Sequence, residues 1–352
     1  MLRGASRSVV HQWRGRGVVV RQPRAVVIDP SVHDAAALQP DRVATSSAGP
    51  FDRPTLSVVI CCYTERRRAQ LEAAITATTA QLGPADELII VVDHNPDLLT
   101  DLLASHPDVV VCANTGTRGL SDARNTGTAR ATGTTVVFLD DDACPAPDAL
   151  AAVRARLRDA SVIAMGGAVA AQWESSAPAW FPEEFGWVVG CDYRGLPDNG
   201  AEIRNPIGAA MAVRRDALDE VGGFSADLGR RGTLPAGCEE TLMGIALRRR
   251  YPDHVIVRDT SFRVSHAVPD DRRRFDYFAR RCYHEGRSKA VLSGLAGAGS
   301  ALASERRYTA QVLPAGVWRH RRSPARVGAL IAGLLLTCAG YASGLLAPKV
   351  RP

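Results

Sequence analysis

Three adjacent aspartates, Asp140, Asp141 and Asp142, directly follow a short apolar run at residues 136–139. Such a run is typical of a buried strand, and prolines at 145 and 147 indicate a turn beyond it. Neighbouring carboxylates repel one another, so a fold that keeps them together usually supplies a cation, and oxygen ligands suit Mg²⁺ or Mn²⁺. At a strand end, such an ion would bind the phosphates of a ligand. A solvated acidic turn or helix cap is the alternative.

Alternating apolar and helical stretches must position these aspartates. The pattern predicts strands at residues 56–62, 87–92, 109–113, 136–139 and 162–167, and helices at residues 66–81, 97–105 and 119–130. This order predicts a mostly parallel sheet with helices on both faces. Neither GxGxxG nor GxxxxGK[ST] follows a strand, which argues against the usual dinucleotide and P-loop sites.

Charge and composition limit the partners of the chain. Residues 1–24 contain six arginines and no acid, whereas the rest of the 352-residue chain has 37 basic and 37 acidic residues. This balance gives no support for nucleic-acid binding, and eight scattered cysteines without a CxxC pair favour a reducing compartment. We expect residues 1–54 to form a basic arm and a linker, with an edge strand at 26–28; a transit peptide is the alternative for the first 24 residues.

Four segments together resemble the inverting family 2 glycosyltransferases of the GT-A fold: residues 56–65, 87–93, 119–125 and 138–142. Each segment is short, but their order and spacing match the family as well as their residues do. The resemblance covers roughly residues 55–290. It implies an α/β protein of GT-A type, Rossmann-like, with a mostly parallel central sheet flanked by helices. It also implies an enzyme that transfers a sugar from a nucleotide diphosphate sugar.

The resemblance assigns five residues to the nucleotide: Thr64, Glu65, Asp93, Arg124 and Asp141. In the family, the positions of the first three hold the base and the ribose, and the position of Arg124 approaches the diphosphate. His94 stands where many members carry a second aspartate, which is a departure from the pattern. An arginine on the surface of a helix is the alternative for Arg124.

The resemblance also assigns a metal site. Asp140 and Asp142 take the positions of the family's DxD motif, and His266, in a strand-like alternating run at residues 261–266, takes the position of a further ligand. A bound Mg²⁺ or Mn²⁺ would stabilise the charge that develops on the leaving nucleoside diphosphate. A structural histidine in a strand is the alternative for His266.

Glu239 and Glu240 begin a predicted helix that continues to Arg250, and they resemble the family's Glu-Asp motif. Inversion needs one base that takes the proton of the acceptor hydroxyl. The resemblance gives Glu240 the position of this base and leaves Glu239 to orient it or the acceptor. The alternative is a pair of acids that the helix dipole favours at a helix N-terminus.

The second half of the chain is expected to supply the acceptor side. Three of the five tryptophans lie between residues 173 and 193, where their rings either stack on sugars or fill a core. The basic helical block at residues 280–289 resembles a subgroup that acts on lipid-phosphate-linked acceptors; a basic helix lying on the membrane is the alternative. No QxxRW motif is present, which speaks against a processive polysaccharide synthase.

Residues 327–347 contain no charge and are long enough to span a bilayer. Gly340 and Gly344 form a GxxxG spacing, which is typical of helix contacts. More arginines precede the run than basic residues follow it, so the positive-inside rule places the catalytic part on the cytoplasmic face. A buried C-terminal helix is the alternative.

Together these observations predict four parts: a basic arm and linker at residues 1–54, a GT-A catalytic domain at 55–290, a basic connector at 291–326 and a membrane helix at 327–347. We expect transfer of a hexose or hexuronic acid, with inversion, from a UDP-sugar to a lipid-linked or glycan acceptor at the cytoplasmic face of a bacterial membrane. The alternatives are a rhamnosyl or other deoxysugar transferase, and an inactive membrane protein that binds nucleotide sugars.

Overall fold

The computed structural model describes residues 54–230 and 236–346. The basic arm at residues 1–53, with the edge strand predicted at 26–28, lies outside the described residues. So do residues 347–352.

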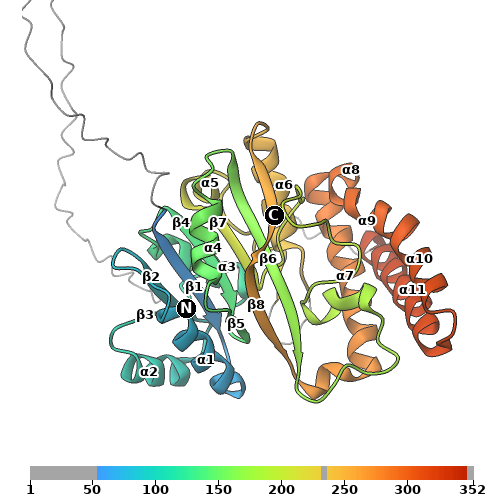
Figure 1. Ribbon diagram of the computed structural model, residues 1–352, viewed down its shortest axis with the longest axis horizontal. Helices are drawn as coiled ribbons and strands as arrows, with labels where there is room; N and C mark the ends of the chain where they lie inside the picture. Colours follow the sequence, from blue (N-terminus) through green and yellow to red (C-terminus); the bar gives the residue numbers. More distant parts are fainter. Residues whose placement is uncertain (1–53, 231–235, 347–352) are drawn as a thin grey trace, which may run out of the picture. The chain divides into compact units, whose positions relative to one another are not determined.

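In the described part of the chain, eight strands form a single sheet in the order β3-β2-β1-β4-β7-β6-β8-β5 (Figure 1). The strands are β1 (Leu56–Cys62), β2 (Glu87–Val92), β3 (Val110–Ala113), β4 (Thr135–Asp140), β5 (Ala143–Pro145), β6 (Val162–Trp173), β7 (Ala210–Arg214) and β8 (Val255–Val268). Strands β3, β2, β1 and β4 pair in parallel, and so do β6 and β8. Strand β7 runs antiparallel to β4 and β6, and β5 runs antiparallel to β8.

Helices flank this sheet (Figure 1). They are α1 (Arg68–Thr79), α2 (Pro96–Ser105), α3 (Leu120–Arg130), α4 (Ala149–Arg156), α5 (Arg215–Glu220), α6 (Glu239–Arg250), α7 (Phe275–Ala296), α8 (Ala298–Ala301), α9 (Ala303–Arg307), α10 (Leu313–Arg319) and α11 (Pro324–Leu346). Short 3₁₀ segments are η1 (Glu65–Arg67), η2 (Glu183–Val189) and η3 (Asp270–Arg273), and η4 (Tyr308–Val312) is a π-helical turn. The predicted α/β fold with a mostly parallel sheet is confirmed.

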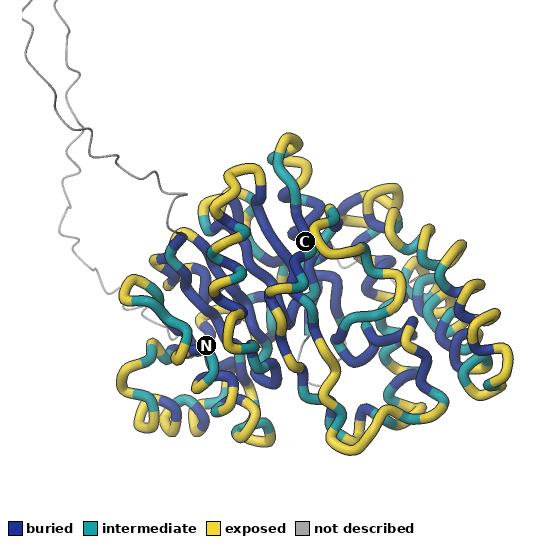
Figure 2. Tube along the Cα trace, viewed as in Figure 1, coloured by how far each residue is buried: buried dark blue, intermediate teal, exposed yellow. Residues whose placement is uncertain are grey.

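The strands at the centre of the sheet are buried, as Figure 2 shows in dark blue. Nearly every residue of β1, β2 and β4 is buried, because parallel strands are covered on both faces. This explains why their sequences are continuous apolar runs. Since β1, β2 and β4 are parallel neighbours, their carboxyl ends meet at one edge of the sheet, where Asp93 and Asp140 lie.

Strand β8 brings His266 to the same region from the other half of the sheet. Its residues alternate between exposed and buried around this position, and its register places His266 opposite Ala143 of β5. Because Asp142 directly precedes β5, a short antiparallel pairing sets the histidine beside the aspartate. The two residues are more than a hundred positions apart in the sequence, and the backbone N–H of Ala267 also donates a hydrogen bond to the carbonyl oxygen of Asp142.

Helices α7 and α11 lie against each other through glycines (Figure 1). A Cβ atom added at Gly340 would come within 1.9 Å of the carbonyl oxygen of Tyr283, and one at Gly286 within 2.0 Å of that of Thr337. The GxxxG spacing at 340 and 344 therefore serves a contact within this chain. The domain boundary predicted at residue 290 falls inside α7, and residues 298–319 form further short helices.

We expect Gly340→Ala to destabilise the protein by about 1–3 kcal/mol, because the new methyl group would force α7 and α11 apart. Gly328→Ala is the matched control, since nothing lies within 4 Å of an added Cβ on the same helix. Alanine there should be neutral or stabilise by up to about 1 kcal/mol. Thermal unfolding of both variants in detergent checks this; equal midpoints would mean that α7 and α11 do not make this contact.

One described helix, α11, is long and apolar enough to cross a membrane, and 22% of its most apolar window is buried. The buried core helix of a soluble protein can have the same length and composition. Large apolar side chains are exposed along α11, among them Leu335 at 63%. The observed helix begins three residues before the predicted segment.

Candidate active site

Asp140, Asp142 and His266 form a cluster at the carboxyl edge of the parallel strands. One ligand atom from each side chain lies within 4.8 Å of the others. The Nε2 atom of His266 is 3.0 Å from Oδ1 of Asp142 and 3.9 Å from Oδ2 of Asp140. Asp142 and His266 are buried, whereas the Asp140 side chain is 29% exposed. Two carboxylates and an imidazole that converge in this way fit a divalent cation.

Two arginines that the sequence analysis did not single out pair with this cluster. Arg67 of η1 lies 2.6 Å from Asp141 and 3.2 Å from Asp142, and Arg272 of η3 lies 3.3 Å from Asp142. Burial alone would raise the pKa of Asp142, but His266, Arg67 and Arg272 hold it well below its usual range. Burial raises the pKa of Asp141 to about 6, although Arg67 opposes the shift.

Arg124 of α3 connects the aspartate cluster to the predicted catalytic glutamates. Its side chain is 3% exposed, so it is not a surface arginine. It donates hydrogen bonds to Oε1 of Glu239 at 3.1 Å, to Oδ1 of Asp140 at 3.3 Å and to the carbonyl oxygen of Gly208. One guanidinium thus sets the distance between the two groups of acids.

Glu239 and Glu240 occupy the first turn of α6, after Cys238 in the left-handed region with φ 77°. Glu239 accepts a hydrogen bond from Arg124 through Oε1, and Oε2 of each glutamate is buried without a hydrogen-bond partner among the described residues. Burial and the neighbouring charge of Glu239 raise the pKa of Glu240 to about 8, against the opposing effect of Arg124. The two glutamates therefore differ: one is fixed by a cation, and the other has a high proton affinity.

Asp93 ties the end of β2 to the start of α3. It accepts hydrogen bonds from Nδ2 of Asn114 at 2.7 Å and from the backbone N–H of Gly119 at 3.0 Å. Nδ1 of His94 lies 2.9 Å from the Asp93 carboxylate, and His94 itself has a positive φ of 52°. His94, the residue that departs from the family pattern, is thus held against Asp93, which is predicted to contact the nucleoside.

A cavity of about 1080 Å³ joins these groups. Its lining includes Asp93, Arg124, Asp140, Asp141, Glu239 and Glu240. Four predicted site residues are not part of the lining: Thr64, Glu65, Asp142 and His266. Thr64 caps η1 and Glu65, which is exposed, accepts a hydrogen bond from Asn95. The volume exceeds that of a usual small-molecule site, so the cavity has room for a nucleotide sugar and part of an acceptor.

The aromatic stretch divides between the two roles that the sequence allowed. Trp187 and Tyr193 line the cavity. Trp180 instead packs among other rings, with its centroid 5.4 Å from that of Phe278. The guanidinium of Arg281 lies over the ring of Trp187, 5.9 Å from its centroid. Core packing therefore accounts for part of the stretch, and two rings remain available to a ligand.

The fold is shared with a known sugar-transferring enzyme. The structure is similar to that of the mannosyltransferase PcManGT from Pyrobaculum calidifontis in complex with GDP-Man and Mn²⁺, with a TM-score of 0.55 and 21% identity over 85% of this chain and 89% of that chain. The sheet and its flanking helices thus have the GT-A fold.

Sequence comparison gives the family. Residues 57–222 match the model of glycosyl transferase family 2. The glucosyl-dolichyl phosphate glucuronosyltransferase of Haloferax volcanii is 34% identical over 241 residues, which are 67% of this chain and 77% of that protein. The chain belongs to the family 2 glycosyltransferases, as its motifs predicted, and is an enzyme that uses a nucleotide sugar. The alternative of an inactive binding protein is not supported.

Proposed function

We propose that this enzyme transfers a hexuronic acid or hexose, with inversion, from a UDP-sugar to a sugar carried on a lipid phosphate. The observation that carries the proposal is the cavity in which Arg124 connects Asp140 to Glu239, beside Glu240. The name of the Haloferax volcanii relative favours a glucuronosyl donor and a glucosyl-dolichyl phosphate acceptor. A plain glycan remains the second acceptor, and a deoxysugar the second donor.

Asp140, Asp142 and His266 would hold Mg²⁺ or Mn²⁺. The convergence of their ligand atoms supports this assignment, and so does the Mn²⁺ in the complex of the Pyrobaculum calidifontis enzyme. When bound, such a cation stabilises negative charge on a diphosphate. Arg67 and Arg272 pair with Asp142 and balance part of the negative charge of the cluster.

Glu240 would take the proton from the acceptor hydroxyl while the oxygen of that hydroxyl forms a bond to the anomeric carbon of the donor. The bond from that carbon to the diphosphate oxygen breaks on the opposite face, which inverts the configuration. The raised proton affinity of Glu240 and its place in the lining of the cavity support the role of base. The pairing of Glu239 with Arg124 supports a positioning role for Glu239.

Arg124 would also face the leaving diphosphate, because it is buried next to Asp140 in the wall of the cavity. Asp93 and Asp141 line the same cavity and are proposed to contact the nucleoside and its phosphates. Thr64 and Glu65 lie at the end of β1 outside the lining. Tyr63 and Arg67, on either side of them in the sequence, line the cavity, so these two residues are proposed to contact the base at its rim.

The lipid part of the acceptor would lie beside α11. Leu334 and Tyr341 of this apolar helix line the same cavity as Glu240, and α11 is the described candidate for a membrane helix. We therefore propose that residues 55–290 form the catalytic domain, that the helices after it anchor the enzyme, and that the catalytic part lies on the cytoplasmic face. The predicted bacterial origin of the membrane is not needed for this proposal.

The pH dependence follows from Glu240. A base with a pKa of about 8 is protonated and inactive at lower pH, so kcat should fall about tenfold per pH unit below that value. Glu239→Gln removes the negative charge that raises this pKa and should shift the acidic limb to lower pH. Steady-state rates at saturating donor and Mn²⁺ measure both profiles; an unshifted limb in Glu239→Gln would contradict the assignment.

A donor screen tests the proposed function. Purified enzyme is heated with UDP-sugars, deoxysugar nucleotides and GDP-mannose, each with and without Mn²⁺, and donor hydrolysis is measured in parallel. We expect a UDP-hexuronic acid or UDP-hexose to stabilise the protein only with Mn²⁺ and to be hydrolysed slowly. Stabilisation by a deoxysugar nucleotide alone would support the second donor class instead.

A further inference from the structure

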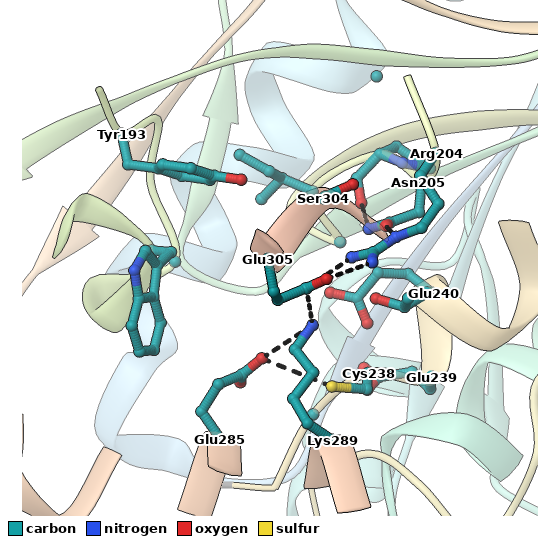
Figure 3. A pocket seen from close by; sticks show the side chains of 18 of the residues that line it. Tyr193, Arg204, Asn205, Cys238, Glu239, Glu240, Glu285, Lys289, Ser304 and Glu305 are labelled. Atoms are coloured by element: carbon teal, nitrogen blue, oxygen red, sulfur yellow. Dashed lines mark hydrogen bonds and ion pairs between the residues drawn. The ribbon is translucent and has the colours of Figure 1, made fainter. Parts of the chain in front are cut away.

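A carboxylate held by two cations lies in the wall of the cavity, away from the aspartate cluster. Glu305 of α9 contacts Arg204, with Oε2 2.7 Å from Nη1 and Oε1 3.0 Å from Nη2, and its Oε1 is 2.5 Å from Nζ of Lys289. Figure 3 shows the three side chains meeting at one point of the cavity, with Glu240 drawn in the same space. All four residues line the cavity.

The cationic part of this contact has the chemistry of a phosphate site. An arginine that binds two oxygens of one group, together with a lysine, suits a phosphate as well as a carboxylate. The side chains of Arg204 and Lys289 are only 13% and 11% exposed, so an anion between them is largely shielded from water. Burial favours the neutral form of Glu305, yet Lys289 and Arg204 lower its pKa to about 2.

The carboxylate comes from a short surface helix, although Tyr308 directly after it packs against the core and donates a hydrogen bond to the carbonyl oxygen of Glu184. Helix α9 has only five residues and none of them is buried, and the π-helical turn η4 that follows has no buried residue either. By contrast, Lys289 belongs to the long helix α7, and the Arg204 guanidinium is also fixed by the carbonyl oxygen of Ala301 and by Asn205. Both cations therefore have further partners, since Lys289 also lies 3.4 Å from Glu285, whereas the contacts of the Glu305 carboxylate in the described part of the chain are these two cations.

Arg204 and Lys289, the cationic pair, lie where the phosphate of a lipid-linked acceptor would be expected. Lys289 lies one turn after Gly286 on α7, and Gly286 is the point at which α7 touches Thr337 of α11. Apolar residues of α10 and α11, such as Leu313 and Leu334, also line the cavity. The pair thus lies in the cavity that contains the proposed base, close to the helix proposed to carry the lipid.

We propose that Arg204 and Lys289 bind the phosphate of the lipid-linked acceptor, and that Glu305 occupies this subsite until the acceptor phosphate displaces it. This inference rests on the proposed function, because it assigns the acceptor phosphate to a place within the same cavity. It makes Glu305 a competitor of the acceptor and leaves the donor site, at Asp140 and Arg124, unaffected.

Two acceptors and three variants of the full-length enzyme in detergent test the inference. The acceptors are glucosyl citronellyl phosphate, which carries a phosphate, and octyl glucoside, which does not. Arg204→Gln and Lys289→Met should each raise KM for the phosphorylated acceptor about 10- to 100-fold, as expected for lost charge-assisted hydrogen bonds. KM for octyl glucoside and the Mn²⁺-dependent affinity for the donor should stay the same.

Glu305→Gln separates a displaced anion from a structural contact. Without the competing charge, KM for the phosphorylated acceptor should fall about 3- to 10-fold. Glu183→Gln is the matched control, because Glu183 pairs with Arg194 at the exposed surface at 2.6 Å, and it should change neither acceptor. If Glu305→Gln lowers only the melting temperature, or raises KM, the contact is structural and the inference is wrong.

The remaining outcomes show whether the phosphate subsite or the proposed acceptor is wrong. Loss of donor affinity in Arg204→Gln and Lys289→Met, with acceptor KM unchanged, would give the pair to the donor diphosphate and overturn the inference. Equal use of both acceptors by the wild type would exclude a phosphate subsite while leaving sugar transfer intact. If the wild type transfers sugar to neither acceptor, the proposed acceptor is wrong. Calorimetry then measures whether glucosyl citronellyl phosphate binds. Binding that weakens in Arg204→Gln would still support the subsite, and binding that does not weaken would overturn it.

Discussion

Glu240→Gln is expected to slow sugar transfer about 10²–10⁴-fold, the usual cost of losing one general base. The amide keeps the shape of the side chain but cannot accept the proton of the acceptor hydroxyl. Donor affinity should change little, because Arg124, which is placed to face the diphosphate, pairs with Glu239 rather than with Glu240. Single-turnover transfer rates, measured beside Mn²⁺-dependent donor affinity, separate chemistry from binding.

Glu239→Gln is the comparison for this variant. Its effect on the rate should be smaller, because an amide still accepts a hydrogen bond from Arg124, which lies 3.1 Å from Oε1. If Glu240→Gln transfers at the wild-type rate while Glu239→Gln is inactive, the two roles are exchanged. If both variants remain active, neither glutamate is the base.

Asp140→Asn should reduce the affinity for Mn²⁺ in the presence of donor by at least about 100-fold. Loss of a residue that only hydrogen-bonds to a metal ligand usually costs about 10- to 100-fold, and loss of a ligand should cost more. We choose Asp140 because its side chain is 29% exposed and faces the cavity. Removing Asp142 would also take from Arg272 the buried carboxylate that it contacts, and from Arg67 one of its two, so a loss of stability would obscure the result.

Calorimetric titration of Mn²⁺ into the donor-bound enzyme measures this effect. The matched control is Asp270→Asn, an aspartate that is half exposed and paired with Arg273 outside the cluster, and it should bind Mn²⁺ as the wild type does. If Asp140→Asn retains wild-type Mn²⁺ affinity, the cluster of Asp140, Asp142 and His266 is not the metal site.

The parallel half of the sheet was predictable because its strands are buried on both faces. Residues 56–62 and 87–92 are apolar except for Ser57 and Glu87 and were assigned with the observed bounds. The acids that follow these strands could be placed at one edge for the same reason. Strand β6 was predicted too short, because its second half is rich in alanine, is partly exposed and continues as a strand through its pairing with β8.

The cationic partners were not predictable, because they depend on long-range contacts. Arg272 lies 130 residues after Asp142, and Glu305 lies 101 residues after Arg204. In the sequence, Arg272 stands in the charged stretch 270–274, which resembles a solvated helix surface, and Arg204 stands before an Asn-Pro pair that indicates a loop. Glu305 was placed in a connector, since nothing in its neighbourhood marks a side chain that reaches the cavity. Arg67 had a weak signal, because it directly follows the predicted nucleotide contacts Thr64 and Glu65.

The most direct test of the central claim follows the product of one reaction by NMR. The enzyme is mixed with an α-linked UDP-glucuronic acid or UDP-hexose, glucosyl citronellyl phosphate and Mn²⁺, and the anomeric proton of the newly attached sugar is observed. The account predicts a β-linked disaccharide on the intact lipid phosphate, formed with Mn²⁺ and not after chelation. An α-linked product, or equal transfer without a divalent cation, would contradict it.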